Sequence, residues 1–294
     1  MRVVIAGSSG LLGSHLVPAL RHARHEVIRL VRRDSKAPDE RGWDPETGVI
    51  EEGTLDGTDA VINLCGAPLG GKRWTAERKR ELLRSRTRPT AVLAEAIGER
   101  GVPTLINASG VDFYGDTGGR VITEAAGPGS GFLADLCQRW EAAAEAAAPA
   151  RVVRLRTGPV LAPSGGLLGQ LKPLFSFMLG GRLGDGTQYM PWISLDDEIS
   201  AIRFVLENPR ISGPVNMTGP EPVSNAEFTR ALGEALGRPA PWIIPGFAMR
   251  AVLGEFAQEV ALTGQRAVPS VLEEHGFTFQ HRTVRSALGA AVSA

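Results

Sequence analysis

Three glycines near the start of the chain, at positions 7, 10 and 13, have a spacing that suits an anion-binding turn. The apolar run 3–6 (VVIA) precedes them, and leucines at helical spacing follow. This order predicts a buried parallel strand, a turn and a helix whose N–H groups face a phosphate. Such glycines let the backbone approach a pyrophosphate, although a purely structural turn has the same residues. The predicted dinucleotide contacts are Gly7, Ser9, Gly10, Leu11, Leu12 and Gly13.

The residues after the second predicted strand, 27–31, bear on which dinucleotide would bind. They are Arg32, Arg33 and Asp34. An acidic residue at this place accepts a hydrogen bond from the ribose 2′-hydroxyl of NAD, whereas an arginine accommodates the 2′-phosphate of NADP. Arg32 therefore favours NADP over NAD. Asp34 leaves NAD open as the alternative, and a solvated surface pair of arginines would look the same in the sequence.

A search for a proton-transfer pair gives a negative result. An oxidoreductase of this class interconverts carbonyls and alcohols. It needs a phenol for proton transfer and, four residues later, a lysine that lowers the phenol's pKa. The chain has two tyrosines, Tyr114 and Tyr189, and the residues four positions later are Gly118 and Ile193. No Tyr-x-x-x-Lys pair therefore exists in this sequence.

Other catalytic constellations fail as well. The five histidines form no His-x-x-x-His pair, so we predict no metal site. The acidic run 196–198 lies where a helix is expected to begin, and helix capping explains it. No Gly-x-Ser-x-Gly elbow occurs, which removes support for a hydrolase triad.

Alternating strands and helices must position these residues. We expect strands at 3–6, 27–31, 59–65, 104–108 and 152–155, a hairpin at 49–50, and helices at 10–23, 75–99, 132–148, 196–207, 225–236, 247–262 and 269–275. A strand at 277–279 and a terminal helix follow. The predicted fold is α/β, a Rossmann-like doubly wound parallel sheet with a smaller C-terminal α/β cap. We assign 1–160 to an NADP-binding core, completed by 190–218, and 161–294 to substrate-side loops and the cap.

Composition restricts the partners. The 294 residues include 32 basic and 32 acidic side chains, so no net charge attracts nucleic acid or an anionic membrane. No stretch is long and apolar enough for a membrane helix, and no signal-peptide core is present. Cys65 and Cys137 lie in apolar segments and form no disulfide framework. We therefore expect a cytoplasmic protein with a small-molecule substrate, either a monomer or a homodimer.

Motifs along nearly the whole chain carry a family resemblance. They are GSSGLLG, VINLCGAPLGGKRW, ASGVDFYG, FLADLCQRWE, LRTGPVLAPSGG, GGRLGDGTQYMPWISLDD, GPVNMTGPEPVSNAEF and GQRAVPSVLEEHGFTF. The chain resembles the atypical extended short-chain dehydrogenase/reductases known as epimerase family proteins. Such proteins join an NAD-dependent epimerase/dehydratase-like domain to a C-terminal domain of unknown function. The G-x-x-G-x-x-G spacing suits this group better than the stricter G-x-G-x-x-G pattern does.

The resemblance also bears on the catalytic residues. FLADLCQRWE is similar to the helix that carries the tyrosine and the lysine in related enzymes. Alignment on Glu141 places Leu133 and Cys137 at those two positions, and a leucine cannot transfer a proton. Of the usual site there remain Ser109, expected to hydrogen-bond the substrate carbonyl, and Tyr114, the best remaining phenol. We interpret Cys137 as a packed helix residue.

Further cofactor contacts follow from the same resemblance. A turn after the third predicted strand is expected to pass under the adenosine and ribose, and Arg86 on the long helix is expected to turn inward. The residues concerned are Asn63, Leu64, Gly66, Ala67 and Arg86, with Ser109 added at the nicotinamide end.

Two functions remain open. The first is an NADP-binding oxidoreductase or epimerase-like enzyme acting on an unidentified small molecule, either a carbonyl compound or one similar to a nucleotide sugar. The alternative is a catalytically silent NADP(H)-binding sensor, which the missing pair would allow. A methyltransferase that binds S-adenosylmethionine is disfavoured, because no acidic residue directly ends the second strand.

Overall fold

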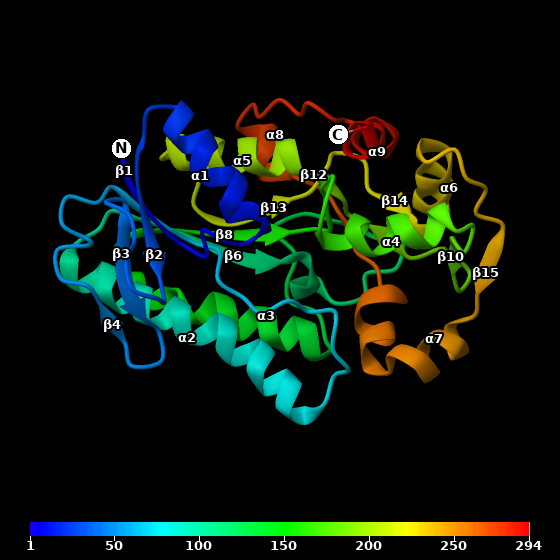
Figure 1. Ribbon diagram of the computed structural model, residues 1–294, viewed down its shortest axis with the longest axis horizontal. Helices are drawn as coiled ribbons and strands as arrows, with labels where there is room; N and C mark the ends of the chain where they lie inside the picture. The colour runs from blue at the N-terminus through cyan, green and yellow to red at the C-terminus, as the bar shows by residue number, and fades with distance from the viewer. Residues whose placement is uncertain (294) are drawn as a thin grey trace.

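An eight-stranded sheet forms the centre of the computed structural model, which describes residues 1–293 (Figure 1). Its strand order is β13-β8-β6-β5-β1-β2-β3-β4, and every neighbouring pair is parallel except β3 with β4. The strands are β1 (Arg2–Ala6), β2 (Glu26–Val31), β3 (Glu40–Asp44), β4 (Val49–Ile50), β5 (Ala60–Asn63), β6 (Thr104–Gly110), β8 (Arg151–Thr157) and β13 (Gly213–Met217). The order reverses at β1, as in doubly wound sheets that bind ligands at the carboxyl ends of their strands.

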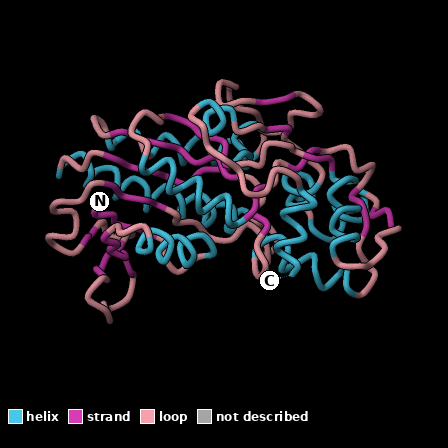
Figure 2. Tube along the Cα trace, turned by 90° about the horizontal axis from the view of Figure 1, so that it is seen from above, coloured by secondary structure: helices cyan, strands magenta, loops and turns pink. Residues whose placement is uncertain are grey.

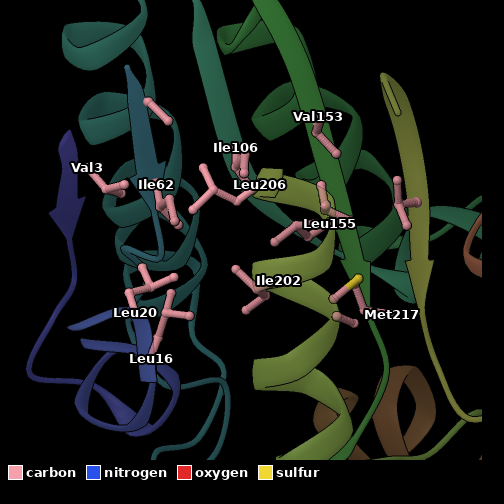
Figure 3. Close-up of a cluster of buried hydrophobic side chains, with 14 of the residues drawn as sticks. Val3, Leu16, Leu20, Ile62, Ile106, Val153, Leu155, Ile202, Leu206 and Met217 are labelled. Carbon is pink, nitrogen blue, oxygen red and sulfur yellow. The ribbon is translucent and has the colours of Figure 1, made fainter. Parts of the chain in front are cut away.

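Helices cover both faces of the sheet because the strands are apolar on both sides. Helices α1 (Leu11–His22) and α5 (Leu195–Glu207) pack on one face, where Val3 shares a core with Leu16 and Leu20 of α1 (Figure 3). Helix α2 (Ala76–Arg100) covers the other face, against Val4 and Ala6, and α3 (Phe132–Ala143) lies beside α2 (Figure 1). Alternate residues of one strand thus enter two separate cores.

The rest of the chain forms a second lobe with its own core around Trp192 and Phe228, and Figure 2 shows helices gathered beyond one end of the sheet. Its helices are α4 (Gly166–Ser176), α6 (Asn225–Ala235), α7 (Gly246–Leu253) and α9 (Val284–Ser293). Helix α8 (Ser270–Glu274) instead packs against β13, and its Leu272 lies in the core of the central sheet. Short strand pairs join distant segments: β9 (Val160–Leu161) with β12 (Ile193–Ser194), β10 (Gly181–Leu183) with β15 (Trp242–Ile244), β11 (Tyr189–Met190) with β14 (Val223–Ser224), and β7 (Val121–Ile122) with β16 (Arg266–Ala267). Three further turns are η1 (Val111–Tyr114), η2 (Glu145–Ala147) and η3 (Ala257–Ala261).

Residues close in the sequence mark the ends of two helices. The Thr75 side chain accepts a hydrogen bond from the Arg78 N–H at the start of α2, and Gly101 ends that helix in the left-handed conformation at φ 68°. Ser224 and Glu227 form a reciprocal capping box at α6. These contacts satisfy backbone groups that a helix end leaves open, so local sequence determines where the helices begin and end.

Three expected elements differ from the structure. The helix expected at 247–262 is interrupted at Gly254, whose φ is 63°, and continues only as the single turn η3. The helix expected at 132–148 leaves α-geometry after Ala143. Residues 277–279 form no strand, because Phe277 and Phe279 stack edge to face at 4.8 Å and pack into the core without a strand partner. Apolar residues at alternate positions were therefore misread as a strand.

Among residues 1–293, no helix is both long enough and apolar enough to cross a bilayer.

Candidate functional site

The glycine turn connects β1 to α1 and is shaped by close backbone contacts. Gly7 has φ 83°, and a Cβ there would lie 2.8 Å from the backbone of Leu64. A Cβ on Gly13 would lie 2.3 Å from the Gly7 carbonyl oxygen, so only glycine fits this close approach of helix and turn. The sequence correctly identified these positions as a tight strand-to-helix turn.

The N-terminus of α1 is open to an anion. Gly10 caps the helix without a side chain, the first turn carries no acidic residue, and the first intrahelical bond runs from the Ser14 N–H to the Gly10 carbonyl. The N–H groups before Ser14 therefore have no intrahelical acceptor. Together with the helix dipole they form a site suited to a phosphate group.

The two arginines after β2 have different partners. Arg33 donates to both carboxylate oxygens of Glu40, at 2.7 and 2.9 Å, and this ion pair holds the pKa of Glu40 at about 2. Arg32 is exposed and makes no side-chain hydrogen bond or ion pair with any residue of the described chain, 1–293. Burial raises the pKa of the half-buried Cys65 thiol in the turn after β5, and the charge of Arg32 opposes this rise. Arg32 is therefore the member of the pair that can receive a ligand at this edge.

Hydrogen bonds to helix α2 and strand β6 hold the turn after β5 in place. The Asn63 side chain donates to Thr90 at 2.8 Å and to Asn107 at 2.7 Å, and accepts from the Cys65 N–H. The Ala67 N–H donates to Ser85 at 3.0 Å. Asn63 is therefore fully occupied by the protein, and what the turn offers a ligand is its backbone.

Arg86 does turn inward, as expected from the sequence. Its guanidinium donates to the Ala67 and Leu82 carbonyl oxygens and lies 5.1 Å from the Trp140 ring centroid. A Cβ on Gly66 would come within 3.2 Å of it. Burial lowers the pKa of Arg86, since few groups nearby offset the loss of water. The arginine supports the turn, and a contact with a cofactor stays a prediction.

Ser109 and Tyr114 lie in one buried hydrogen-bond network at the end of β6. Ser109 Oγ donates to Glu141 at 2.8 Å, and Arg156 forms two bonds of 2.8 Å with the same carboxylate. Arg156 also donates to the Tyr114 hydroxyl at 3.0 Å, and that hydroxyl donates to Asn216 at 2.7 Å. Both hydroxyl protons are therefore already donated to protein acceptors. The catalytic roles expected of Ser109 and Tyr114 stay predictions.

A second polar group, which the sequence analysis did not single out, lies at the same strand end. Asp112 belongs to η1, directly after β6, and is only partly buried. Burial of its carboxyl raises the pKa to about 6, opposed by its own backbone N–H and by the charge of Arg86. The sequence signal that could have identified Asp112 is an acidic residue between two apolar ones, in the turn that follows a parallel strand.

The positions that the resemblance aligns with tyrosine and lysine lie on α3. Leu133 and Cys137 are both buried in an apolar cluster with Phe113 and Trp140. Burial, together with the nearby carboxylates of Asp112 and Glu141, strongly raises the pKa of the Cys137 thiol. The interpretation of Cys137 as a packed, unreactive residue agrees with these surroundings.

Two other observations bear on ligands. No cluster of three or more His, Cys, Asp or Glu side chains suited to a metal ion occurs in the part of the chain that the structure describes, 1–293. An open cavity of about 810 Å³ lies between α6 and β15. Its lining includes Arg182, Arg230, Arg238 and Trp242, but none of the site residues predicted from the sequence.

Comparison with known proteins agrees with this arrangement. The model of the NAD dependent epimerase/dehydratase family matches residues 3–217, and a domain of unknown function matches residues 244–291. An epimerase family protein of Mycobacterium bovis is 53% identical over 99% of this chain and 97% of its own length. A chloroplastic relative from Arabidopsis thaliana is 36% identical over 99% of this chain and 86% of its own.

A solved structure is also similar. The human epimerase family protein SDR39U1, crystallised with NADPH, superposes with a TM-score of 0.89 at 30% identity, over 100% of this chain and 99% of the human one. Sequence and structure thus agree over both lobes. The chain belongs to the NAD-dependent epimerase/dehydratase family.

Proposed function

We propose that this protein is an NADP-dependent oxidoreductase or epimerase-like enzyme that acts on a small carbonyl or nucleotide-sugar-like molecule. The observation that carries the proposal is the exposed Arg32, which has no side-chain partner within residues 1–293 and follows β2, the neighbour of the strand that leads into the N-terminus of α1. A phosphate on the ribose would contact the Arg32 guanidinium, and a pyrophosphate would contact the N–H groups at the start of α1. The human relative crystallised with NADPH supports the same choice of cofactor.

The residues present fit this cofactor. The turn from Gly7 to Gly13 would hold the pyrophosphate, Arg32 the 2′-phosphate, and the backbone of 63–67 would lie under the adenosine and ribose. When bound, the nicotinamide supplies hydride exchange with the substrate. Ser109 accepts no hydrogen bond from any residue of 1–293, so we propose that its oxygen receives one from the substrate.

Cofactor preference tests the proposal. We expect the wild type to bind NADPH about 10 to 100 times more tightly than NADH, since a charge-assisted phosphate contact contributes about 1.5–3 kcal/mol. Arg32→Ala should remove most of that preference. Arg33→Ala is the matched control, because it removes the same charge from an arginine already paired with Glu40. Equal affinities of the wild type for the two cofactors, measured by titration calorimetry, would contradict the proposal.

A silent NADP(H)-binding sensor is the second candidate, favoured by Leu133 and Cys137 at the positions where proton-transfer residues are expected. Turnover separates the two functions. Oxidation of NADPH that depends on a carbonyl substrate, and is weakened by Ser109→Ala, supports the enzyme. NADPH binding without reduction of any member of a broad carbonyl panel supports the sensor.

The organisation of the chain is proposed on the same basis. A cofactor-binding core of 1–160, completed by 190–218, and a substrate-side part of 161–294 are supported by the pairing of β13 with β8. We propose a cytoplasmic protein without nucleic-acid or membrane partners, as monomer or homodimer. The equal numbers of acidic and basic residues support the absence of nucleic-acid and anionic-membrane partners.

A further inference from the structure

The direction in which the cofactor would lie follows from the strand order. This step rests on the proposed function. Arg32 follows β2, on one side of β1, so an adenosine phosphate held by Arg32 places the adenosine half on that side. On the other side of β1 come β5 and then β6. The nicotinamide half therefore extends over the carboxyl ends of β5 and β6.

Three residues meet at the end of β6. A Cβ placed on Gly110 would lie 3.1 Å from Asp112 Oδ2 and 3.5 Å from Cys137 Sγ. Because Gly110 has no side chain, the Asp112 carboxyl and the Cys137 thiol can both approach its Cα closely. Cys137 is also the position at which the family resemblance places the lysine of related enzymes. A carboxyl thus lies beside the place where proton-transfer chemistry is expected.

The Asp112 carboxyl differs from the hydroxyls near it. No other residue of the described chain, 1–293, donates a hydrogen bond to this carboxyl from its side chain, whereas Ser109 and Tyr114 both donate to protein acceptors. The charged or titratable groups that face Asp112 come from three elements: Arg86 of α2, Cys137 of α3 and Glu259 of η3. Partial exposure leaves Asp112 accessible to a ligand and to water.

The ionisation of Asp112 suits a group that both gives and takes a proton. Burial raises its pKa to about 6, so protonated and ionised forms coexist near neutral pH. A general acid or base works best when its pKa lies near the working pH. Cys137 does not meet this condition, since burial raises its pKa strongly.

We propose that Asp112 is the residue that exchanges a proton with the substrate at the nicotinamide end of the site. A bound reduced nicotinamide would supply the hydride that reduces the substrate carbonyl carbon, and would itself be oxidised. Asp112 would give its proton to the carbonyl oxygen, so that the product is an alcohol and Asp112 remains as a carboxylate. Water returns the proton to Asp112. The reverse direction uses the same carboxylate as the base.

Cofactor binding tests this role without a known substrate. The oxidised nicotinamide ring is positively charged and the reduced ring is neutral, so an Asp112 carboxylate nearby favours NADP⁺ over NADPH. We measure both dissociation constants between pH 5 and pH 8. In the wild type, Kd(NADPH)/Kd(NADP⁺) should rise about tenfold with pH as Asp112 ionises. The 2′-phosphate, whose second pKa is about 6, titrates in both cofactors and cancels in the ratio.

Two variants complete the experiment. In Asp112→Asn the ratio should be independent of pH, with Asp112→Ser as a second variant if the first does not fold. Asp116→Asn, an exposed carboxylate in the following loop, should keep the wild-type rise. A flat ratio in the wild type, or an unchanged rise in Asp112→Asn, overturns the inference alone. Failure of the wild type to bind either cofactor overturns the proposed function as well.

Discussion

Two polar groups at the end of β6 have opposite characters. In the first, Ser109, Glu141, Arg156 and Tyr114 satisfy one another within a buried network. In the second, Asp112 is held next to Gly110 and Cys137 and accepts no side-chain hydrogen bond within residues 1–293. A saturated network specifies a packing, whereas an ionisable group held with few partners has interactions left for a ligand. The residue types alone would have suggested the reverse assignment.

Breaking the saturated network should have the largest effect. Arg156→Met leaves the Glu141 carboxylate buried without its cation, so we expect a loss of about 3–5 kcal/mol in the free energy of unfolding. Urea titration at pH 7 measures it. Arg154→Met is the control, because Arg154 pairs at 3.0 Å with a Glu145 that is 63% exposed and should cost less than about 1 kcal/mol. Equal losses for the two variants would show that the buried network contributes no more to the free energy of unfolding than the exposed ion pair does.

The two groups also differ in how far the sequence could identify them. The glycine turn and the parallel sheet depend on patterns among neighbouring residues, and the sequence predicted them correctly. The pairing of Glu141 with Arg156 joins α3 to β8, and only packing brings them together. The raised pKa of Asp112 likewise depends on helices distant in sequence. In the segment ASGVDFYG, the sequence predicted roles for Ser109 and Tyr114 but none for Asp112, which lies between them.

Removing the charge of Asp112 should raise the free energy of unfolding, whereas breaking the buried network lowers it. Burial raises the folded-state pKa of Asp112 to about 6, from its ordinary value of 3.8. As the pH rises from 4 to 6, the unfolded chain loses this proton before the folded chain does, so ionisation lowers stability across that window and the penalty is complete above it. Asp112→Asn should therefore be more stable than the wild type by about 2 kcal/mol at pH 8, allowing for partial exposure.

Unfolding titrations at pH 4 and pH 8 measure this difference. The advantage of Asp112→Asn should fall to about 0.5 kcal/mol at pH 4, where the folded-state carboxyl is protonated and the unfolded-state carboxyl is only about half ionised. Asp116→Asn changes the same charge at an exposed position and should differ little from the wild type at either pH. A loss of stability in Asp112→Asn at pH 8 would mean that Asp112 has a protein partner and belongs with the saturated network.

The smallest effect is expected at the edge of the saturated network. Tyr114→Phe removes a hydroxyl that accepts from Arg156 at 3.0 Å and donates to Asn216 at 2.7 Å. Both partners keep other hydrogen bonds, since Arg156 still holds Glu141 and Asn216 still donates to the Val268 carbonyl, so the free energy of unfolding should fall by only about 1 kcal/mol. Tyr189→Phe removes the other phenol of the chain, which is only half-buried, and should change the free energy of unfolding by less than about 0.5 kcal/mol.

Because Tyr114 lies outside the Asp112 group, Tyr114→Phe should also leave the pH dependence of the NADPH and NADP⁺ affinities unchanged. A flattened ratio in Tyr114→Phe would join the two groups into one site and restore the phenol as a participant in proton transfer.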